Sequence, residues 1–234
     1  CLRMGQLAME AGFPPGVINI VPGYGPTAGA SIVKHPQVDK VAFTGEHLTA
    51  QIIMKDAAQT LKRLTFELGG KSPNIIFADA DLDAAIAGAE FGLFFNQGQC
   101  CCAGSRLFVQ EDAHDELIPR LIKAYQTLPV GDPLDSKTLI GPLIDTAAMN
   151  TMSAALKQAQ TEGGLVHGGD QVLADQFPDA AYVAPAIVEM PSQSAIMHTE
   201  TFAPILYVVK YQDLEKAIEM HNAVPQGLSS CIFS

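Results

Sequence analysis

Three consecutive cysteines, Cys100–Cys102, stand in the stretch FFNQGQCCCAG, whereas the rest of the 234-residue chain holds only two more. A nucleophilic thiol needs partial exposure and a lowered pKa, which a loop held by rigid elements can supply. Gly98 and Gly104 flank the cysteines, and small residues let main-chain N–H groups approach a reacting atom and stabilise an oxyanion. Three buried thiols that pack as small apolar side chains explain the triplet equally well.

A zinc site is the weaker hypothesis for these thiols, because the chain has no CxxC pair and its six histidines are scattered. We therefore predict no metal. Neighbouring cysteines rarely bond each other, since a disulfide needs particular Cα and Cβ spacing. The odd total of five cysteines adds to this argument, so we predict reduced thiols and a cytoplasmic location.

Glu67 is the second candidate for chemistry, in the stretch FELGGKSPN. It stands at the end of an expected strand, where open α/β sheets bind ligands. The apolar neighbours Phe66 and Leu68 would raise its pKa and suit a general base. Taken alone, a salt-bridged carboxylate at the end of a strand is the better explanation.

Two glycine-containing loops, residues 22–29 and 43–50, each lie between an expected strand and a helix. A helix that begins there can offer its N-terminal N–H groups to a phosphate. Neither loop has the GxGxxG pattern, so an ordinary turn explains each one as well.

The elements that must position these residues alternate along the chain, which predicts an α/β fold with open, mostly parallel sheets. We expect helices at residues 2–12, 30–35, 47–61, 82–95, 113–128, 146–164 and 213–222. We expect strands at 17–21, 40–45, 63–70, 74–77 and 106–109, and within 180–190, 203–211 and 228–233. Asp79 or Asp81 should cap the fourth helix, and Pro119 should kink the fifth or mark a late start.

Composition excludes some classes of function. The formal net charge is −11, and a nucleic-acid partner would require a basic face. No apolar run approaches the roughly 20 residues of a membrane span, and no signal peptide is visible. The chain begins at Cys1 rather than Met and ends on an apolar run, from which we expect a fragment of a longer protein.

Four stretches together resemble the NAD(P)-dependent aldehyde dehydrogenase superfamily: FELGGKSPN, FFNQGQCCCAG, AGFPPGVINIVPGYGPTAG and HTETFAPILYV. The resemblance implies a three-layer fold, with residues 1–69 as the last part of a Rossmann-like cofactor domain and 70–234 as the catalytic domain. It also implies that the parent protein oxidises a small-molecule aldehyde with NAD or NADP and forms a homo-oligomer, a dimer or a tetramer.

Motif by motif, the resemblance makes Cys101 the nucleophile, which forms a thiohemiacetal and then a thioester. Glu67 matches the base that activates water for thioester hydrolysis, and the N–H of Cys101 matches half of the oxyanion hole. Cys100 then neighbours the substrate, and Cys102 is a packing residue. Cofactor-binding positions are implied at Gly25, Pro26, Gly45, Glu46, Leu68, Gly69, Glu200 and Phe202.

The sequence departs from the family at the diphosphate turn. Glu46 replaces a serine, and a negative charge there opposes an anion. Ala50 replaces a second glycine and adds a methyl where close approach is needed. Two alternatives follow: a thiol-dependent esterase or acyl-transfer protein on the same scaffold without hydride transfer, and an inactive truncated fragment.

The two halves of the chain resemble different branches of the family. The first half is similar to the retinal, acetaldehyde and betaine-aldehyde branch. From about Gly131 the sequence is similar to the aminoadipic-semialdehyde branch. Cys100 stands where that second branch has a substrate-binding Arg, so the aldehyde stays open.

Overall fold

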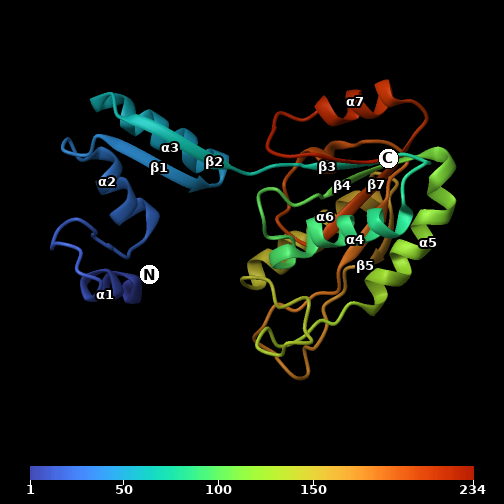
Figure 1. Ribbon diagram of the computed structural model, residues 1–234, viewed down its shortest axis with the longest axis horizontal. Coiled ribbons are helices and arrows are strands. Elements are labelled where there is room, and N and C mark those ends of the chain that lie inside the picture. The colour runs from blue at the N-terminus through green and yellow to red at the C-terminus, as the bar shows by residue number, and fades with distance from the viewer. The chain divides into compact units, whose positions relative to one another are not determined.

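A computed structural model describes all residues of the chain, 1–234, as two compact units, Cys1–Leu68 and Gly69–Ser234 (Figure 1). The division falls one residue before the boundary at residue 69 that the sequence predicts. The paired glycines Gly69 and Gly70 follow the last strand of the first unit.

The first unit contains a two-stranded parallel sheet and three α-helices. Its elements are α1 (Leu2–Glu10), α2 (Ala30–Lys34), β1 (Lys40–Gly45), α3 (His47–Ala57) and β2 (Arg63–Leu68), with a π-helical turn at Gly25–Gly29 and a 3₁₀ turn at Ala58–Thr60. Thr44 lies opposite Glu67, and Gly45 opposite Leu68. The carboxyl ends of β1 and β2 therefore coincide.

The predicted strand at residues 17–21 is wrong. Val17, Ile18 and Val21 are exposed, and the segment has no regular secondary structure. A strand requires a hydrogen-bonded neighbour, and in this unit only β1 and β2 pair with each other. The apolar run is therefore not buried as the pattern suggested.

The second unit is built on a six-stranded sheet of order β5-β6-β7-β4-β3-β8. The strands are β3 (Pro73–Ile76), β4 (Arg106–Gln110), β5 (Leu165–Gly168), β6 (Ala186–Glu189), β7 (Ile205–Tyr211) and β8 (Cys231–Phe233). All neighbours are parallel except β5 and β6. The sequence analysis did not predict β5, which forms one edge.

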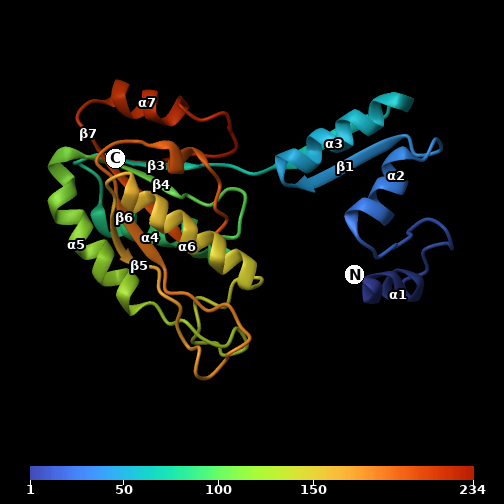
Figure 2. The ribbon, with the colours of Figure 1, turned by 180° about the vertical axis from the view of Figure 1, so that it is seen from behind.

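Helices cover both faces of this sheet, which confirms the three-layer α/β prediction (Figures 1 and 2). The helices are α4 (Leu82–Phe94), α5 (Glu111–Thr127), α6 (Thr146–Thr161) and α7 (Leu214–Asn222), with 3₁₀ turns at Phe95–Gly98 and Ala195–His198. Phe108 and Tyr207 pack in the core that contains α6 and α7. Leu107 and Val208 pack in the core of α4 and α5, since successive strand residues point to opposite faces.

Local signals fix most helix ends as predicted. The carboxylate of Asp81 accepts from the N–H groups of Asp83 and Ala84 and so caps α4. Gly163, at φ +91°, follows α6. Of the two effects predicted for Pro119, the late start of α5 is wrong, because the helix begins at Glu111 and continues through this proline. No helix is both long and apolar enough to cross a bilayer.

Candidate active site

The three cysteines lie in a turn between α4 and β4, as predicted. The N–H of Ala103 donates to the carbonyl of Cys100 at 3.1 Å and closes this turn. Cys100 packs against the α4–α5 core, Cys101 is half-buried and Cys102 is exposed. The prediction that Cys102 is a packing residue is therefore wrong, because the turn places Cys100, not Cys102, against the core.

The backbone before the thiols is strained. Asn96 and Gln97 have φ of +52° and +56°, and Gly98 follows at +72°. Each left-handed residue other than glycine costs on the order of 1–2 kcal/mol, and such strain persists where the surroundings impose it. Side-chain amides impose it here, since Asn96 Nδ2 donates to the carbonyl of Gln99 at 2.9 Å.

Two further amides fix the thiol loop to the connection that precedes α6. Gln97 Oε1 accepts from the N–H of Gly141 at 3.3 Å, and Gln99 Oε1 accepts from that of Ile144 at 3.1 Å. The sequence analysis missed both glutamines. Their clustering with Asn96 in front of the cysteines was the available signal.

The thiol loop also meets the segment Glu200–Ala203. A Cβ at Gly98 would stand 2.6 Å from the carbonyl oxygen of Ala203. The residue before that alanine, Phe202, has φ +57° and is 43% exposed. Two strained segments from distant parts of the sequence thus lie against each other.

Glu200 is held by the paired glycines at the start of this unit. Its Oε1 accepts from the N–H of Gly70 at 3.1 Å. A side chain on Gly69 would overlap the Glu200 carboxylate, and one on Gly70 would clash with the Cys101 carbonyl. The second unit thus brings together the predicted residues Gly69, Cys101, Glu200 and Phe202.

Two buried cations lie behind these loops, and the sequence analysis did not single them out. Lys71 is 3% exposed. Its pKa is lowered to about 7, mainly by burial and also by the charge of Arg106, while the charge of Glu200 acts in the opposite direction. Its ammonium stands 5.2 Å from the centre of the Tyr207 ring, close enough for a cation–π contact. Arg106 Nε donates to the Lys71 carbonyl at 2.7 Å, and burial lowers the arginine pKa to about 10.

Glu67 lies in the first unit, at the carboxyl end of β2, and is exposed. The half-buried Phe66 and Leu68 alternate with it along the strand. Strand neighbours point to opposite faces, so these two residues do not surround the carboxylate. The predicted apolar environment is absent for that reason.

Glu46 occupies the N-terminus of α3. Its Oε2 accepts from the N–H groups of Leu48 at 2.8 Å and Thr49 at 3.2 Å, and its Oε1 lies 2.6 Å from His47 Nδ1. The carboxylate thus holds the same donors that a phosphate would use. Ala50 is 4% exposed, so its methyl is packed within the unit.

The other predicted cofactor positions of the first unit lie at loop and strand ends. Gly25 and Pro26 open the π-helical turn and are exposed, and a Cβ at Gly25 would meet no atom within 4 Å. At Gly45 a Cβ would stand 2.6 Å from the ring of Phe43. The nearby Phe43 ring therefore leaves no room for a side chain at position 45, whereas packing does not require a glycine at position 25.

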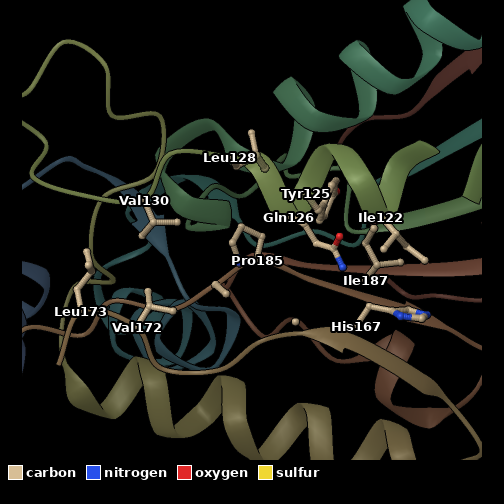
Figure 3. Close-up of a pocket in the computed structure, with 12 residues that line it drawn as sticks. Ile122, Tyr125, Gln126, Leu128, Val130, His167, Val172, Leu173, Pro185 and Ile187 are labelled. Atoms are coloured by element: carbon tan, nitrogen blue, oxygen red, sulfur yellow. The ribbon is translucent and has the colours of Figure 1, made fainter. Parts of the chain in front are cut away.

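A cavity in the second unit is lined by none of the predicted site residues. It has a volume of about 350 Å³ and is lined by α5 residues such as Ile122 and by Val172, Pro185 and Ile187 (Figure 3). A second hollow, of about 20 Å³, lies between Cys100, Glu200 and Phe202. That volume is about the space of one water molecule, so the thiol and Glu200 loops are closely packed.

The family model described as the aldehyde dehydrogenase family matches residues 1–234. The chain belongs to this family. It is 44% identical to the mitochondrial aldehyde dehydrogenase of Mesocricetus auratus, over 100% of this chain and 46% of that protein. It is 41% identical to human retinaldehyde dehydrogenase 3, over 100% of this chain and 45% of that protein.

Among solved structures, PnpE from Pseudomonas sp. WBC-3 superposes with a TM-score of 0.96 at 38% identity, covering 100% of this chain and 48% of that chain. Another structure of PnpE is a complex with nicotinamide adenine dinucleotide. The chain thus spans about half the length of the relatives that it matches. The matches to the mitochondrial and retinaldehyde enzymes extend over residues 131–234 as well, where the likeness to the aminoadipic-semialdehyde branch stays a prediction.

Proposed function

We propose that the full-length protein containing this chain oxidises an aldehyde to a carboxylic acid with NAD or NADP, with Cys101 as nucleophile and Glu67 as general base. Family membership over the whole chain supports the reaction class. The observation that carries the residue assignment is the turn of Cys101, against which Gly70 packs and which strained Asn96 and Gln97 precede.

In the proposed reaction the Cys101 thiolate attacks the aldehyde carbon and forms a thiohemiacetal. The main-chain N–H of Cys101 donates to the developing oxyanion in this step. When bound, NAD or NADP supplies the acceptor for the hydride. Glu67 then takes a proton from the water that hydrolyses the Cys101 thioester.

The residues of the second unit fit a nicotinamide nucleotide. Glu200, fixed by the Gly70 N–H, offers a carboxylate that suits ribose hydroxyls, and the exposed ring of Phe202 suits a planar group. Gly69, which has no side chain, permits the close approach of the Glu200 carboxylate. The remaining parts of the dinucleotide would be held by the first unit, through Gly25, Pro26, Gly45 and Leu68. Glu46 fits a diphosphate only after its carboxylate leaves the N-terminus of α3.

We also propose a domain assignment, an oligomeric state and a cellular location. We assign the first unit to the cofactor domain and the second to the catalytic domain, and we propose a homo-oligomeric parent protein. The five free cysteines support a reducing, cytoplasmic location, although several relatives are named as mitochondrial enzymes. Immunofluorescence of the tagged full-length protein and light scattering test these two points.

The decisive experiment replaces each thiol in the full-length protein. Cys101→Ala is expected to lower kcat by more than about 1,000-fold, whereas Cys100→Ala and Cys102→Ala should retain most of the activity. Glu67→Gln should leave a rapid burst of reduced cofactor and slow the steady state. Full turnover by Cys101→Ala would refute the assignment.

One observation favours the esterase alternative, namely the Glu46 carboxylate on the α3 N–H groups. That alternative requires Cys101-dependent hydrolysis of an activated ester together with no binding of NAD or NADP, as measured by calorimetry. The third alternative, an inactive fragment, is tested by assaying the 234-residue chain alone. Cofactor turnover by that chain would exclude it.

A further inference from the structure

The sulfur atoms of Cys100, Cys101 and Cys102 converge. All three Sγ atoms lie within 4.8 Å of one another, and those of Cys100 and Cys102 are 3.5 Å apart. Consecutive side chains diverge in a strand. Here the turn closed by Ala103 and Cys100 folds the backbone so that the three thiols face one another.

These distances suit a thiophilic cation. Thiolate sulfur binds zinc at about 2.3 Å, so two sulfurs on one tetrahedral zinc are about 3.8 Å apart. The observed spacing of the Cys100 and Cys102 sulfurs is 3.5 Å, and no pair exceeds 4.8 Å. The three sulfurs therefore lie near the spacing that a shared tetrahedral cation requires.

The thiols are accessible and free. All five cysteines of the chain are unpaired, Cys102 is exposed, and Cys100 and Cys101 are half-buried. A cation can reach them from solvent, and a water can occupy a fourth position. A bound cation would deprotonate these thiols, since thiols lose their protons when they ligate a metal.

We propose that Cys100, Cys101 and Cys102 form a three-thiolate site for a divalent thiophilic cation such as Zn²⁺. On binding, three S–H bonds break, three sulfur–metal bonds form, and up to three protons pass to the buffer. No electron is transferred. The chain has no CxxC pair, but the turn brings three adjacent cysteines together as one ligand set. This inference does not depend on the proposed aldehyde oxidation.

The test titrates the reduced, metal-free 234-residue chain with Zn²⁺ in a calorimeter and counts the thiols that a chromogenic disulfide then modifies. One Zn²⁺ per chain should bind, release protons and protect three of the five thiols. Cys100→Ser, Cys101→Ser and Cys102→Ser should each weaken binding by more than about 10-fold, since even an outer-shell change costs that much.

Cys231→Ser is the matched control, because it removes an exposed thiol of the same unit outside the triplet. It should leave affinity and stoichiometry unchanged. Cd²⁺ provides a second probe, through the thiolate-to-metal absorption band in the ultraviolet. Protection of fewer than three thiols, or loss of binding in Cys231→Ser, overturns the proposal. Circular dichroism of each variant separates ligand loss from unfolding.

Discussion

The α-carbon of Gly70 lies against the main-chain carbonyl of Cys101, and a Cβ at this glycine would stand 2.6 Å from the carbonyl oxygen. Real Cβ atoms essentially never lie within 3.0 Å of a heavy atom from a non-adjacent residue, so a side chain at this position would force the carbonyl to move. The glycine therefore allows the segment that holds Glu200 to touch the turn that bears the thiols. The position of that turn depends on the missing side chain.

Gly70→Ala is expected to displace the Cys101 carbonyl, to destabilise the fold by about 1–3 kcal/mol, and to lower kcat/KM of the full-length protein. Urea unfolding and steady-state kinetics measure the two effects. Gly92→Ala is the control, since this glycine lies in α4 with no atom within 4 Å of an added Cβ. It should stabilise the helix by about 1 kcal/mol. Wild-type stability and turnover in Gly70→Ala would show that the contact positions nothing.

Glu46→Ser is expected to strengthen dinucleotide binding by the full-length protein about 3- to 10-fold, because it removes a carboxylate that competes for the Leu48 and Thr49 N–H groups. Serine also caps helices, so stability should change by less than about 0.5 kcal/mol. Calorimetry at fixed ionic strength measures the affinity. Asp81→Ser makes a similar exchange at the N-cap of α4 and should leave the affinity unchanged. Unchanged affinity in Glu46→Ser would mean that the diphosphate does not use these donors.

Arg106→Lys is expected to cost about 2–4 kcal/mol of unfolding free energy. Arg106 is 1% exposed, and its guanidinium donates to the carbonyls of Lys71, Met220 and His221. An ammonium has no planar fork that reaches these acceptors together. In contrast, Arg120→Lys changes a more exposed ion-pairing residue of α5 and should cost less than about 1 kcal/mol. Equal urea midpoints for the two variants would contradict this role of Arg106.

Stability should depend on pH through Lys71. Its folded-state pKa of about 7 lies below the ordinary value of 10.5, so between these values the unfolded chain binds more protons. The free energy of unfolding should therefore rise with pH across this window, by about 1 kcal/mol per pH unit from this group. Tyr207, whose pKa burial raises to about 12, stays protonated there. Arg106, whose pKa burial lowers to about 10, acts in the same direction only at the upper end of the window.

Lys71→Met should remove that dependence, which urea titrations between pH 7 and pH 10 would show as a shallower slope for the variant. Lys123→Met changes an exposed lysine of α5 instead and should keep the wild-type slope. The same slope in Lys71→Met and wild type would mean that the buried ammonium is not the group that titrates.

The sequence by itself determined most elements, the family and the location of the thiols after a helix. The signals for these elements act within a few residues, so they can be seen in the sequence alone. They are the spacing of apolar residues, the cap at Asp81 and the glycine after α6. The strand expected at residues 17–21 failed, because pairing depends on a partner that no local pattern specifies. The edge strand β5 was missed for the same reason.

Only the tertiary structure decided how the site is arranged. It packs Gly70 against Cys101 and Gly98 against Ala203, and it turns Cys102 outward. It also buries Lys71 beside Arg106, which gives an ordinary lysine an unusual pKa. Apart from the cysteine turn, each of these contacts joins residues that are far apart in the sequence. Residue types alone therefore cannot specify the distances, burial and strain that packing imposes.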